Sequence, residues 1–304
     1  SGETLIPVTE LVSNASSGLT AYDEEPVLDV APDGSIGIAW RRRLMRNDAE
    51  GLQENWNLFF LLMDEDGQIF EGPINVTQNE GWYQSNSLNY DVPRFWDPQI
   101  KANEQNYFGL TWRKEMDLAP IEFCDEACKL DDIYYAIYDT TGMPIKMRTK
   151  LTSDSALDSE AYANPSITSL TDDRWIVVYS HTQGGMAFSI LTDTGNLLQG
   201  NSFIGSTRTG FSPVILQTLE SNHIIIAYTA WTIKNPEIHV LVLNSETYKL
   251  ISEPIVLANS AATTGGDFAS ITQDSQGNVI LTWMDFSANS RQHLYYALLD
   301  HDGN

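Results

Sequence analysis

Acidic side chains stand where several predicted strands begin or end, and paired carboxylates at such positions could perform hydrolysis. Glu25 and Asp97 each precede a proline, and Asp267 and Asp285 occupy comparable positions in the last part of the chain. Glycoside hydrolysis uses two carboxyl groups, about 5–5.5 Å apart in retaining enzymes and about 6.5–9.5 Å apart in inverting ones. These four residues are the candidate catalytic acids of a hydrolase; otherwise they are acids that help to form turns.

Basic and aromatic residues gather in the first half of the chain. Arg41 and Arg113 each follow a strand-ending tryptophan, so the two could bind a carboxylate or sulfate, or pair instead with local acids such as Asp48 and Glu115. Aromatic rings either stack on a sugar or a partner, or pack their own loops onto the fold. We expect Trp82 and Tyr83, in a polar run, to face a ligand. The candidate ligand-binding residues are Trp82, Tyr83, Arg94, Trp96, Asp97, Arg41 and Arg113.

Two further groups of residues bear on redox state and metal binding. Cys124 and Cys128 form the string C-D-E-A-C and either close a small local disulfide in an oxidising compartment or stay reduced. Zinc is not expected, because its four ligands are not at hand in the nearby sequence. The string 300–304, D-H-D-G-N, has the start of a calcium loop without the later glutamate, so no cofactor is expected and only Ca²⁺ is left open.

The composition excludes two classes of partner. The chain has 41 acidic and 17 basic residues, a net charge of −24, so it repels nucleic acid and anionic lipid headgroups. No apolar run reaches the roughly 18 residues of a membrane-spanning helix. We therefore expect neither nucleic-acid binding nor insertion into a membrane.

A repeat holds these residues in place. Five segments combine a proline or small residue, a hydrophobic strand, a tight turn and a second strand that ends in an aromatic residue. They run from 26 to 40, 98 to 112, 165 to 179, 213 to 228 and 269 to 283, so the first and last positions of each segment are 14 or 15 residues apart. A third, nearly continuous apolar strand follows in each copy, as expected for a strand buried on both faces. A further turn, typically D-x-x-G, leads to a fourth strand.

This repeat predicts an all-β fold, a five-bladed β-propeller with four-stranded antiparallel blades in a single domain over 1–304. The blades are expected at about 24–78, 97–153, 164–205, 212–258 and 267–304 plus 1–14. The last copy stops where its fourth strand should begin, so the N-terminal strand is expected to close the last blade. Long connections are expected at 41–56, 79–97 and 113–131, and connections of that length usually carry function.

The repeat resembles the sialidase-like repeats of secreted bacterial and archaeal surface proteins. The likeness is clearest in D-P-Q-I-K-A and F-G-L-T-W within 97–112, and in S-I-T-Q-D-S-Q-G-N-V-I-L-T-W at 270–283. Sialidases carry Asp boxes of the form S-x-D-x-G-x-T-W, which this sequence lacks. The resemblance therefore implies the propeller fold and an extracellular or cell-surface setting, and not sialidase activity. Asp97-Pro98 also resembles a D-P motif of five-bladed glycosidases.

Three functions remain open on this evidence. The leading one is an extracellular binding or adhesion module of a larger surface protein, which recognises a glycan or a protein through its long connections. Its other partners would be the neighbouring domains of that chain. The alternatives are a five-bladed glycoside hydrolase, with paired carboxylates at the channel mouth, and a structural spacer domain. The sequence leaves enzymatic activity open and favours a role without it.

Overall fold

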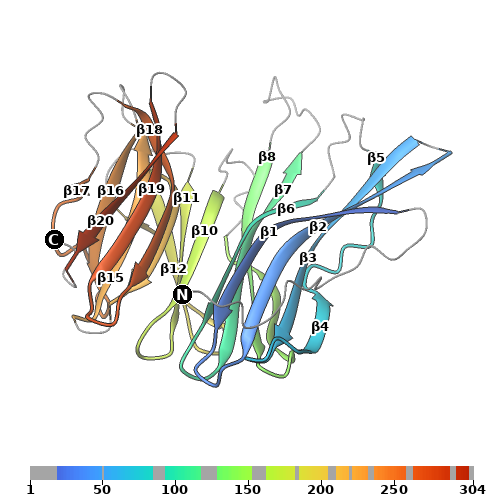
Figure 1. The fold of residues 1–304 in the computed structure, drawn as a ribbon, viewed down its shortest axis with the longest axis horizontal. Coiled ribbons are helices and arrows are strands. Elements are labelled where there is room, and N and C mark those ends of the chain that lie inside the picture. Colours follow the sequence, from blue (N-terminus) through green and yellow to red (C-terminus); the bar gives the residue numbers. More distant parts are fainter. Residues whose placement is uncertain are drawn as a thin grey trace. The chain divides into compact units, whose positions relative to one another are not determined.

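The computed structural model confirms the all-β prediction over the residues that it describes, which are 19–49, 51–84, 93–117, 129–152, 162–181, 185–204, 210–218, 221–231, 236–257, 263–287 and 292–300. The strands form five antiparallel sheets (Figure 1). The chain divides into two compact units, residues 1–149 (unit 1) and 150–304 (unit 2). Within the described ranges, no helix has the length and apolar character needed to cross a membrane.

Unit 1 contains the first two sheets. The first has the order β1 (Thr20–Val30), β2 (Ile36–Asp48), β3 (Gly51–Met63), β4 (Ile69–Asn75), and the short β5 (Tyr83–Gln84) pairs with β3. The second has the order β6 (Arg94–Ala102), β7 (Tyr107–Asp117), β8 (Lys129–Asp139), β9 (Pro144–Lys150). Each strand therefore pairs with the next strand in the chain, as in the predicted repeat.

Unit 2 contains the other three sheets. The first two are β10 (Tyr162–Ser169), β11 (Trp175–His181), β12 (Met186–Leu191), β13 (Leu197–Ile204), and β14 (Gly210–Gln217), β15 (His223–Trp231), β16 (Pro236–Asn244), β17 (Ile255–Val256). The last is β18 (Thr263–Gln273), β19 (Val279–Ser287), β20 (Gln292–Leu299). Among the described strands this sheet has three members, with β20 at its edge.

The D-x-x-G turns follow from local hydrogen bonding. Asp64 Oδ1 accepts hydrogen bonds from the backbone N–H of Asp66 at 3.1 Å and of Gln68 at 2.8 Å. Gly67 has a φ of 76°, a left-handed conformation that glycine adopts without steric cost. Asp139 and Asp274 accept the equivalent pairs of hydrogen bonds in their own turns. Aspartate side chains thus stabilise the β3–β4, β8–β9 and β18–β19 turns.

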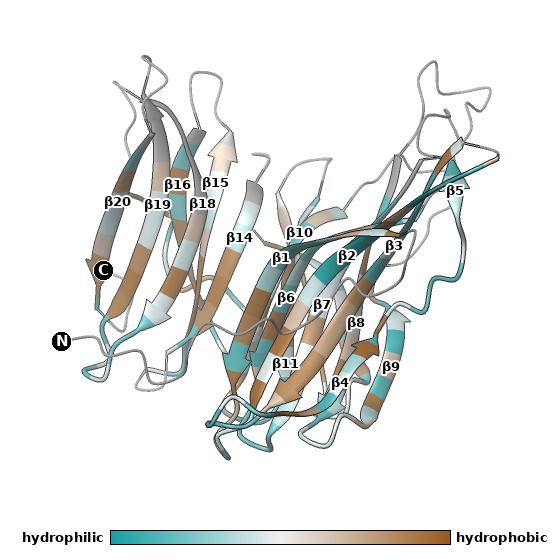
Figure 2. Cartoon of the chain, turned by 45° about the vertical axis from the view of Figure 1, so that its right-hand side comes forward, coloured by the Kyte–Doolittle hydropathy of each residue, from teal (hydrophilic) through white to brown (hydrophobic). Residues whose placement is uncertain are grey.

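The hydrophobic core of unit 1 lies between its two sheets. Hydrophobic residues fill the end of β3, Leu58–Met63 (Figure 2). Phe60 from this stretch is fully buried, and its ring lies 5.8 Å from that of Phe108 on β7 and 5.2 Å from that of Tyr138 on β8. Burial of such rings is a main source of stability. The predicted two-sided burial of the third strand is therefore observed here.

A second recurring feature is a bulge at the residue before a proline in the first strand of four sheets. Glu25, Asp97, Asn164 and Ser212 have φ values of 55°, 53°, 49° and 48°. The register of β1, β6, β10 and β14 breaks at these residues. The left-handed region is uncommon for residues other than glycine, and a bulge turns a side chain away from the regular strand direction. The repeat thus places one polar side chain at an equivalent bulge in four sheets.

The expected long connection at 41–56 is wrong. β2 continues to Asp48 and β3 begins at Gly51, so most of this stretch is a regular hairpin. Cross-strand contacts explain the extension: Arg46 Nη2 donates a hydrogen bond of 2.7 Å to Gln53, and Arg43 lies over the ring of Trp56. The arginines of this segment are therefore strand residues.

Other predicted features lie outside the described residues, or partly so. The ends of the connections expected at 79–97 and 113–131 belong to the strands β5, β6, β7 and β8. The middle parts of these connections, residues 85–92 and 118–128, are not described. Cys124 and Cys128, the closing strand within 1–14 and the string 301–304 also fall there. The disulfide and the closing strand stay predictions, and Ca²⁺ binding at 300–304 stays an open alternative.

Candidate functional site

Two of the predicted carboxylates lie side by side in unit 1. Glu25 and Asp97 occupy the bulges of β1 and β6, and the backbone N–H of Asp97 donates a hydrogen bond of 3.1 Å to Glu25 Oε2. Both side chains are partly exposed to solvent. The repeat therefore brings together two acids that are 72 residues apart in the sequence.

Arg41 forms an ion pair with Glu25. Its Nη2 donates a hydrogen bond to Glu24 and lies 3.3 Å from Oε1 of Glu25. Its guanidinium carbon lies 3.8 Å from the centre of the Trp96 ring and 5.0 Å from that of Trp56. Such cation–π contacts are strongest when the cation is desolvated, and Arg41 is only 5% exposed. Arg41 is thus fixed between two rings and two carboxylates.

Arg113 pairs with the second acid. Its Nε lies 3.1 Å from Asp97 Oδ2, and its Nη1 lies 3.6 Å from Asp131 Oδ2 and 4.0 Å from Glu115 Oε2. Glu115 also accepts a hydrogen bond of 3.1 Å from Arg94. Of the two roles left open for these arginines, pairing with local acids is the one that the contacts show.

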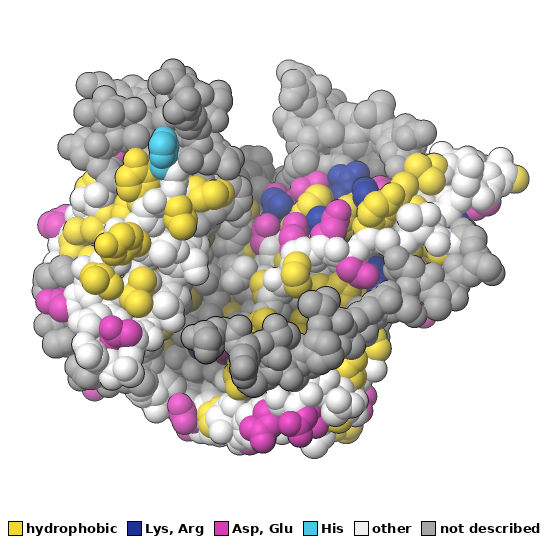
Figure 3. Space-filling model, in the orientation of Figure 1, with side chains coloured by type: hydrophobic (Ala, Val, Ile, Leu, Met, Phe, Trp, Pro, Cys, Tyr) yellow, Lys and Arg dark blue, Asp and Glu magenta, His cyan; other side chains and the backbone are white. Residues whose placement is uncertain are grey.

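We call this set of residues the bulge cluster. It consists of Glu24, Glu25, Arg41, Trp56, Arg94, Trp96, Asp97, Arg113, Glu115 and Asp131. Figure 3 shows basic and acidic side chains gathered in one area of unit 1. The sequence missed Glu24 and Asp131. Glu24 stands directly opposite Arg41 in the β1–β2 register, and a sequence does not show such a register.

Glu25 has an altered acidity. Burial raises the pKa of its carboxyl above the ordinary value of 4.5, and the nearby acids Asp97 and Glu24 raise it further. The guanidinium of Arg41 and the hydrogen bond from Asp97 oppose this shift without cancelling it. A carboxyl with a raised pKa holds its proton at a higher pH, which is a property of catalytic acids and also of acids in structural ion-pair clusters.

Some donors of the cluster lack an acceptor. Within the described part of the chain, the buried atoms Nε and Nη1 of Arg41 and Nε1 of Trp56 and of Trp96 have no hydrogen-bond partner. Buried polar groups in folded proteins are hydrogen-bonded in about nine of ten cases. The cluster therefore keeps more donors than its own acceptors satisfy.

Tyr83 pairs with Glu54 of β3, and Trp82 lies against Arg46 of β2. Asn55 donates hydrogen bonds from Nδ2 to the carbonyls of Asn79 at 2.9 Å and Gly81 at 2.6 Å, which fixes the segment that leads to both aromatics. The guanidinium of Arg46 lies 4.2 Å from the centre of the Trp82 ring, and Tyr83 packs against the core of unit 1. Both side chains are partly buried. The packing of Tyr83 gives it a structural role, and ligand binding by Trp82 and Tyr83 stays a prediction.

The other two candidate acids belong to unit 2. Asp267 lies on β18 opposite Met284, and Asp285 on β19 lies opposite Gly266, so the two acids are one step out of register. The directions of their side chains lie outside what the structure describes. Among the described residues, no group of three or more His, Cys, Asp or Glu side chains is placed to hold a metal ion.

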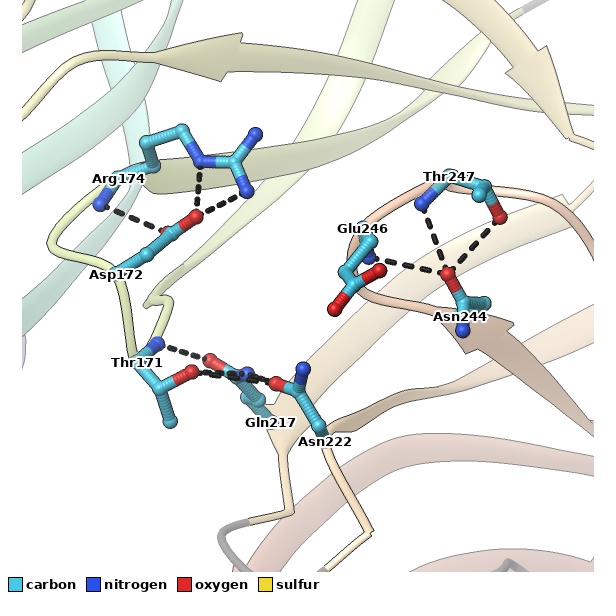
Figure 4. A network of polar contacts seen from close by, with 8 residues as sticks. All are labelled: Thr171, Asp172, Arg174, Gln217, Asn222, Asn244, Glu246 and Thr247. Carbon is cyan, nitrogen blue, oxygen red and sulfur yellow. Dashed lines mark hydrogen bonds and ion pairs between the residues drawn. The ribbon is translucent and has the colours of Figure 1, made fainter.

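Unit 2 has a polar network of a different kind at the turn ends of its strands (Figure 4). The backbone N–H of Thr171 donates a hydrogen bond of 2.7 Å to Gln217 Oε1, and Gln217 Nε2 donates one of 2.7 Å to Asn222. Beside it, Arg174 pairs with Asp172 of its own turn. The contacts of Thr171, Gln217 and Asn222 join the β10–β11 turn to β14 and the turn after it, and so tie two neighbouring sheets together.

Comparison with known proteins shows similarity at the level of fold. No family model matches the chain, and no curated protein matches its sequence. A Hadza microbial sialidase is 10% identical with a TM-score of 0.53, over 90% of this chain and 55% of that one. An ulvan lyase of polysaccharide lyase family PL25, bound to -[GlcA(1-4)Rha3S]-, is 9% identical with a TM-score of 0.53, over 90% of this chain and 68% of that one.

An endo-arabinase from Bacteroides thetaiotaomicron is 14% identical with a TM-score of 0.44, over 90% of this chain and 92% of that one. The structural neighbours are β-propeller proteins. At these identities the likeness shows the fold alone. The chain thus shares with propellers its all-β architecture of antiparallel, mostly four-stranded sheets.

Proposed function

We propose that this protein binds a glycan at the bulge cluster of unit 1, as a module of an extracellular or cell-surface protein. The observation that carries the proposal is the pair of partly exposed carboxylates, Glu25 and Asp97, which ion pairs and a hydrogen bond hold in place. Fixed carboxylates accept hydrogen bonds from sugar hydroxyls, and fixed polar groups give a binding site its specificity. Two structural neighbours are a polysaccharide lyase and a sialidase, which supports a glycan as the ligand.

A glycan array probed with the whole 304-residue chain tests this proposal. We expect a restricted set of glycans to bind, and the variant Glu25→Gln to lose at least about tenfold in affinity for them, as expected when a charged hydrogen-bond acceptor is neutralised. Binding of no glycan at all would refute the proposal and leave the spacer role. Equal binding by the variant would place the site elsewhere.

A second candidate function is glycoside hydrolysis at the same residues. It is favoured by one observation: the pKa of Glu25 is raised by burial, while the adjacent Asp97 is paired with Arg113. Glycoside hydrolases use two carboxyl groups in unlike environments, one as the acid and the other as base or nucleophile. Release of reducing ends from the glycans that bind would show this activity, and its absence after prolonged incubation would leave binding alone.

For the fold, we propose that the five sheets are the blades of one propeller, which a strand from residues 1–14 closes. In unit 2, the described part of the last sheet ends at β20, and its side chains Leu294, Tyr296 and Leu298 are 76%, 72% and 62% exposed. In unit 1, Leu28 and Val30 of β1 are also exposed. Isolated apolar sheet faces and open edges are unfavourable, and closure of a ring would cover them.

Deletion of residues 1–14 tests this closure. We expect the melting temperature to fall by several degrees, because an open edge and apolar surface become accessible to water. Deletion of the last two residues, Gly303 and Asn304, is the control and should change little. An unchanged melting curve after the N-terminal deletion would contradict the closed ring.

A further inference from the structure

The carboxylates at and beside the two bulges are more exposed than the guanidinium groups that pair with them. The side chains of Glu24, Glu25 and Asp97 are 37%, 35% and 27% exposed, against 6% for Arg41 and 20% for Arg113. Arg94 is 27% exposed and pairs with Glu115, which is 9% exposed. Arg41 lies beneath the two glutamates and against the face of Trp96. A ligand that approaches the bulges from solvent therefore meets hydrogen-bond acceptors with negative charge before it meets Arg41 and Arg113.

The arginines of the cluster already have partners. Arg41 pairs with Glu24 and Glu25, Arg113 pairs with Asp97, and the ion-pair contacts of Arg94 and Arg113 extend to Glu115 and Asp131. Three guanidinium groups thus face five carboxylates. The donor atoms of Arg41 that lack a hydrogen-bond partner among the described residues are buried. To pair with a guanidinium from solvent, an acidic ligand would therefore have to displace one of these carboxylates and leave it beside its own negative charge. Loss of a partly buried ion pair and a new like-charge contact each oppose such binding.

We infer that this site takes an uncharged, hydroxyl-rich sugar and excludes uronic and sulfated sugars. The inference rests on the proposed function, and it names the class of glycan. A hydroxyl group donates to the exposed carboxylates and also accepts from N–H groups, whereas a carboxylate or sulfate of a ligand only accepts. Among the described residues, the buried donors of Arg41 and Trp56 have no hydrogen-bond partner, so the cluster is not a closed set of ion pairs.

The same contacts argue against an amino sugar as the ligand. An ammonium group donates to carboxylates but accepts nothing, so the donors of Arg41 and Trp56 gain no partner from it. The exposed carboxylates also have guanidinium groups beside them, Arg41 next to the two glutamates and Arg113 next to Asp97. These cations reduce the attraction that a positively charged ligand would experience.

The experiment compares one glycan in two charge states. Each neutral oligosaccharide that binds on the array is oxidised at its primary alcohols to carboxylates, and both forms are titrated into the chain by calorimetry. We expect the oxidised form to bind at least about tenfold more weakly, because its carboxylates meet those of the cluster. Affinity for the neutral form should stay constant between low and high salt, since screening acts on charges. Chitosan oligomers, which carry amino groups, are expected to bind more weakly than the neutral oligosaccharides at high salt, where the general attraction to an acidic chain is screened.

Two variants separate the inference from a general loss of binding. Glu24→Gln combined with Glu25→Gln removes two exposed charges, and we expect the ratio between the neutral and oxidised affinities to fall at least about fivefold. Asp33→Asn makes a charge change at an exposed turn, where its side chain accepts a local hydrogen bond, and should leave the ratio unchanged.

The outcomes distinguish this inference from the proposed function. If no glycan binds, the proposed function fails. If glycans bind but the acidic or amino-sugar ones bind best, or if the ratio is the same in the double glutamine variant, the proposed function stands and the inference of a neutral ligand is overturned.

Discussion

Equivalent positions of the repeat carry different chemistry in the two units. In unit 1 the bulge residues are Glu25 and Asp97, and arginines follow the strand-ending tryptophans; in unit 2 the bulges hold Asn164 and Ser212. The backbone is nearly the same, with φ values of 55° and 53° against 49° and 48°. The repeat therefore sets the geometry of these positions, and the residue type decides whether a position carries charge.

The turn ends of the strands show the opposite relation. In unit 1, Asp29 accepts a hydrogen bond of 2.7 Å from the backbone of Ala102, and in unit 2 Gln217 accepts one of 2.7 Å from Thr171. The first contact joins β1 to β6, and the second joins the β10–β11 turn to β14, so each connects two neighbouring sheets. Different residues thus do the same structural task there. At the bulge end the residue types differ between the units in charge, and that end is where we place the ligand.

The largest expected effects are equal in the two units. Trp112→Ala in unit 1 and Tyr179→Ala in unit 2 remove fully buried rings at the same repeat position. Each should lower the free energy of unfolding by about 3–5 kcal/mol, the usual cost of such a truncation. Chemical denaturation measures both. A near-zero effect in one unit would contradict their structural equivalence, and the exposed Met143→Ala is the control.

A smaller effect should separate the units. Arg41→Ala leaves Glu24 and Glu25 without their cation and removes the contact with Trp96, so we expect a loss of about 3 kcal/mol in unfolding free energy. The equivalent change in unit 2, Ser180→Ala, removes a buried hydroxyl that has no partner in the described part of the chain. That change should cost less than about 0.5 kcal/mol. Equal losses would mean that Arg41 has no special role.

The smallest effect concerns pH. The pKa of Glu25 is raised in the folded protein above 4.5, so the folded state binds more protons than the unfolded state just above that pH. Stability from this group is therefore highest below pH 4.5 and decreases as the pH rises through the raised pKa. Burial is the main cause of the raised pKa of Glu25, and the charged groups that modify it are Arg41, Asp97 and Glu24. In Glu25→Gln, the decrease in melting temperature over this range should be smaller than in the wild type; an identical pH profile would contradict the shift.

The all-β architecture of antiparallel, mostly four-stranded sheets was predictable from the sequence because each copy repeats its own local signals. Pro26, Pro98 and Pro165 each lie next to a bulge, and aspartates such as Asp139 close the turns. These signals act over a few residues, so sequence spacing alone reveals them. The extended β2–β3 hairpin was missed because its stability comes from cross-strand pairs such as Arg46 with Gln53.

The site was predicted only in part, because its contacts depend on register and on packing between sheets. Asp97, Arg41 and Arg113 were named as ligand-binding residues, but the sequence did not decide whether the arginines face a ligand or neighbouring acids. Asp131 pairs with Arg113 across the β7–β8 hairpin, and Trp96 stacks on Arg41 from another sheet. Such pairs appear only when the sheets are placed against each other within the unit.

One exchange of residues tests the central claim, that the charge of the unit 1 bulges binds the glycan. Asp97→Asn and Asn164→Asp swap the two residue types at equivalent left-handed positions, which both residues tolerate. Calorimetric titration with a glycan from the array should show an affinity loss of at least about tenfold for Asp97→Asn and no change for Asn164→Asp. If Asp97→Asn binds like the wild type while both variants keep their melting temperature, the glycan does not bind at the bulge cluster.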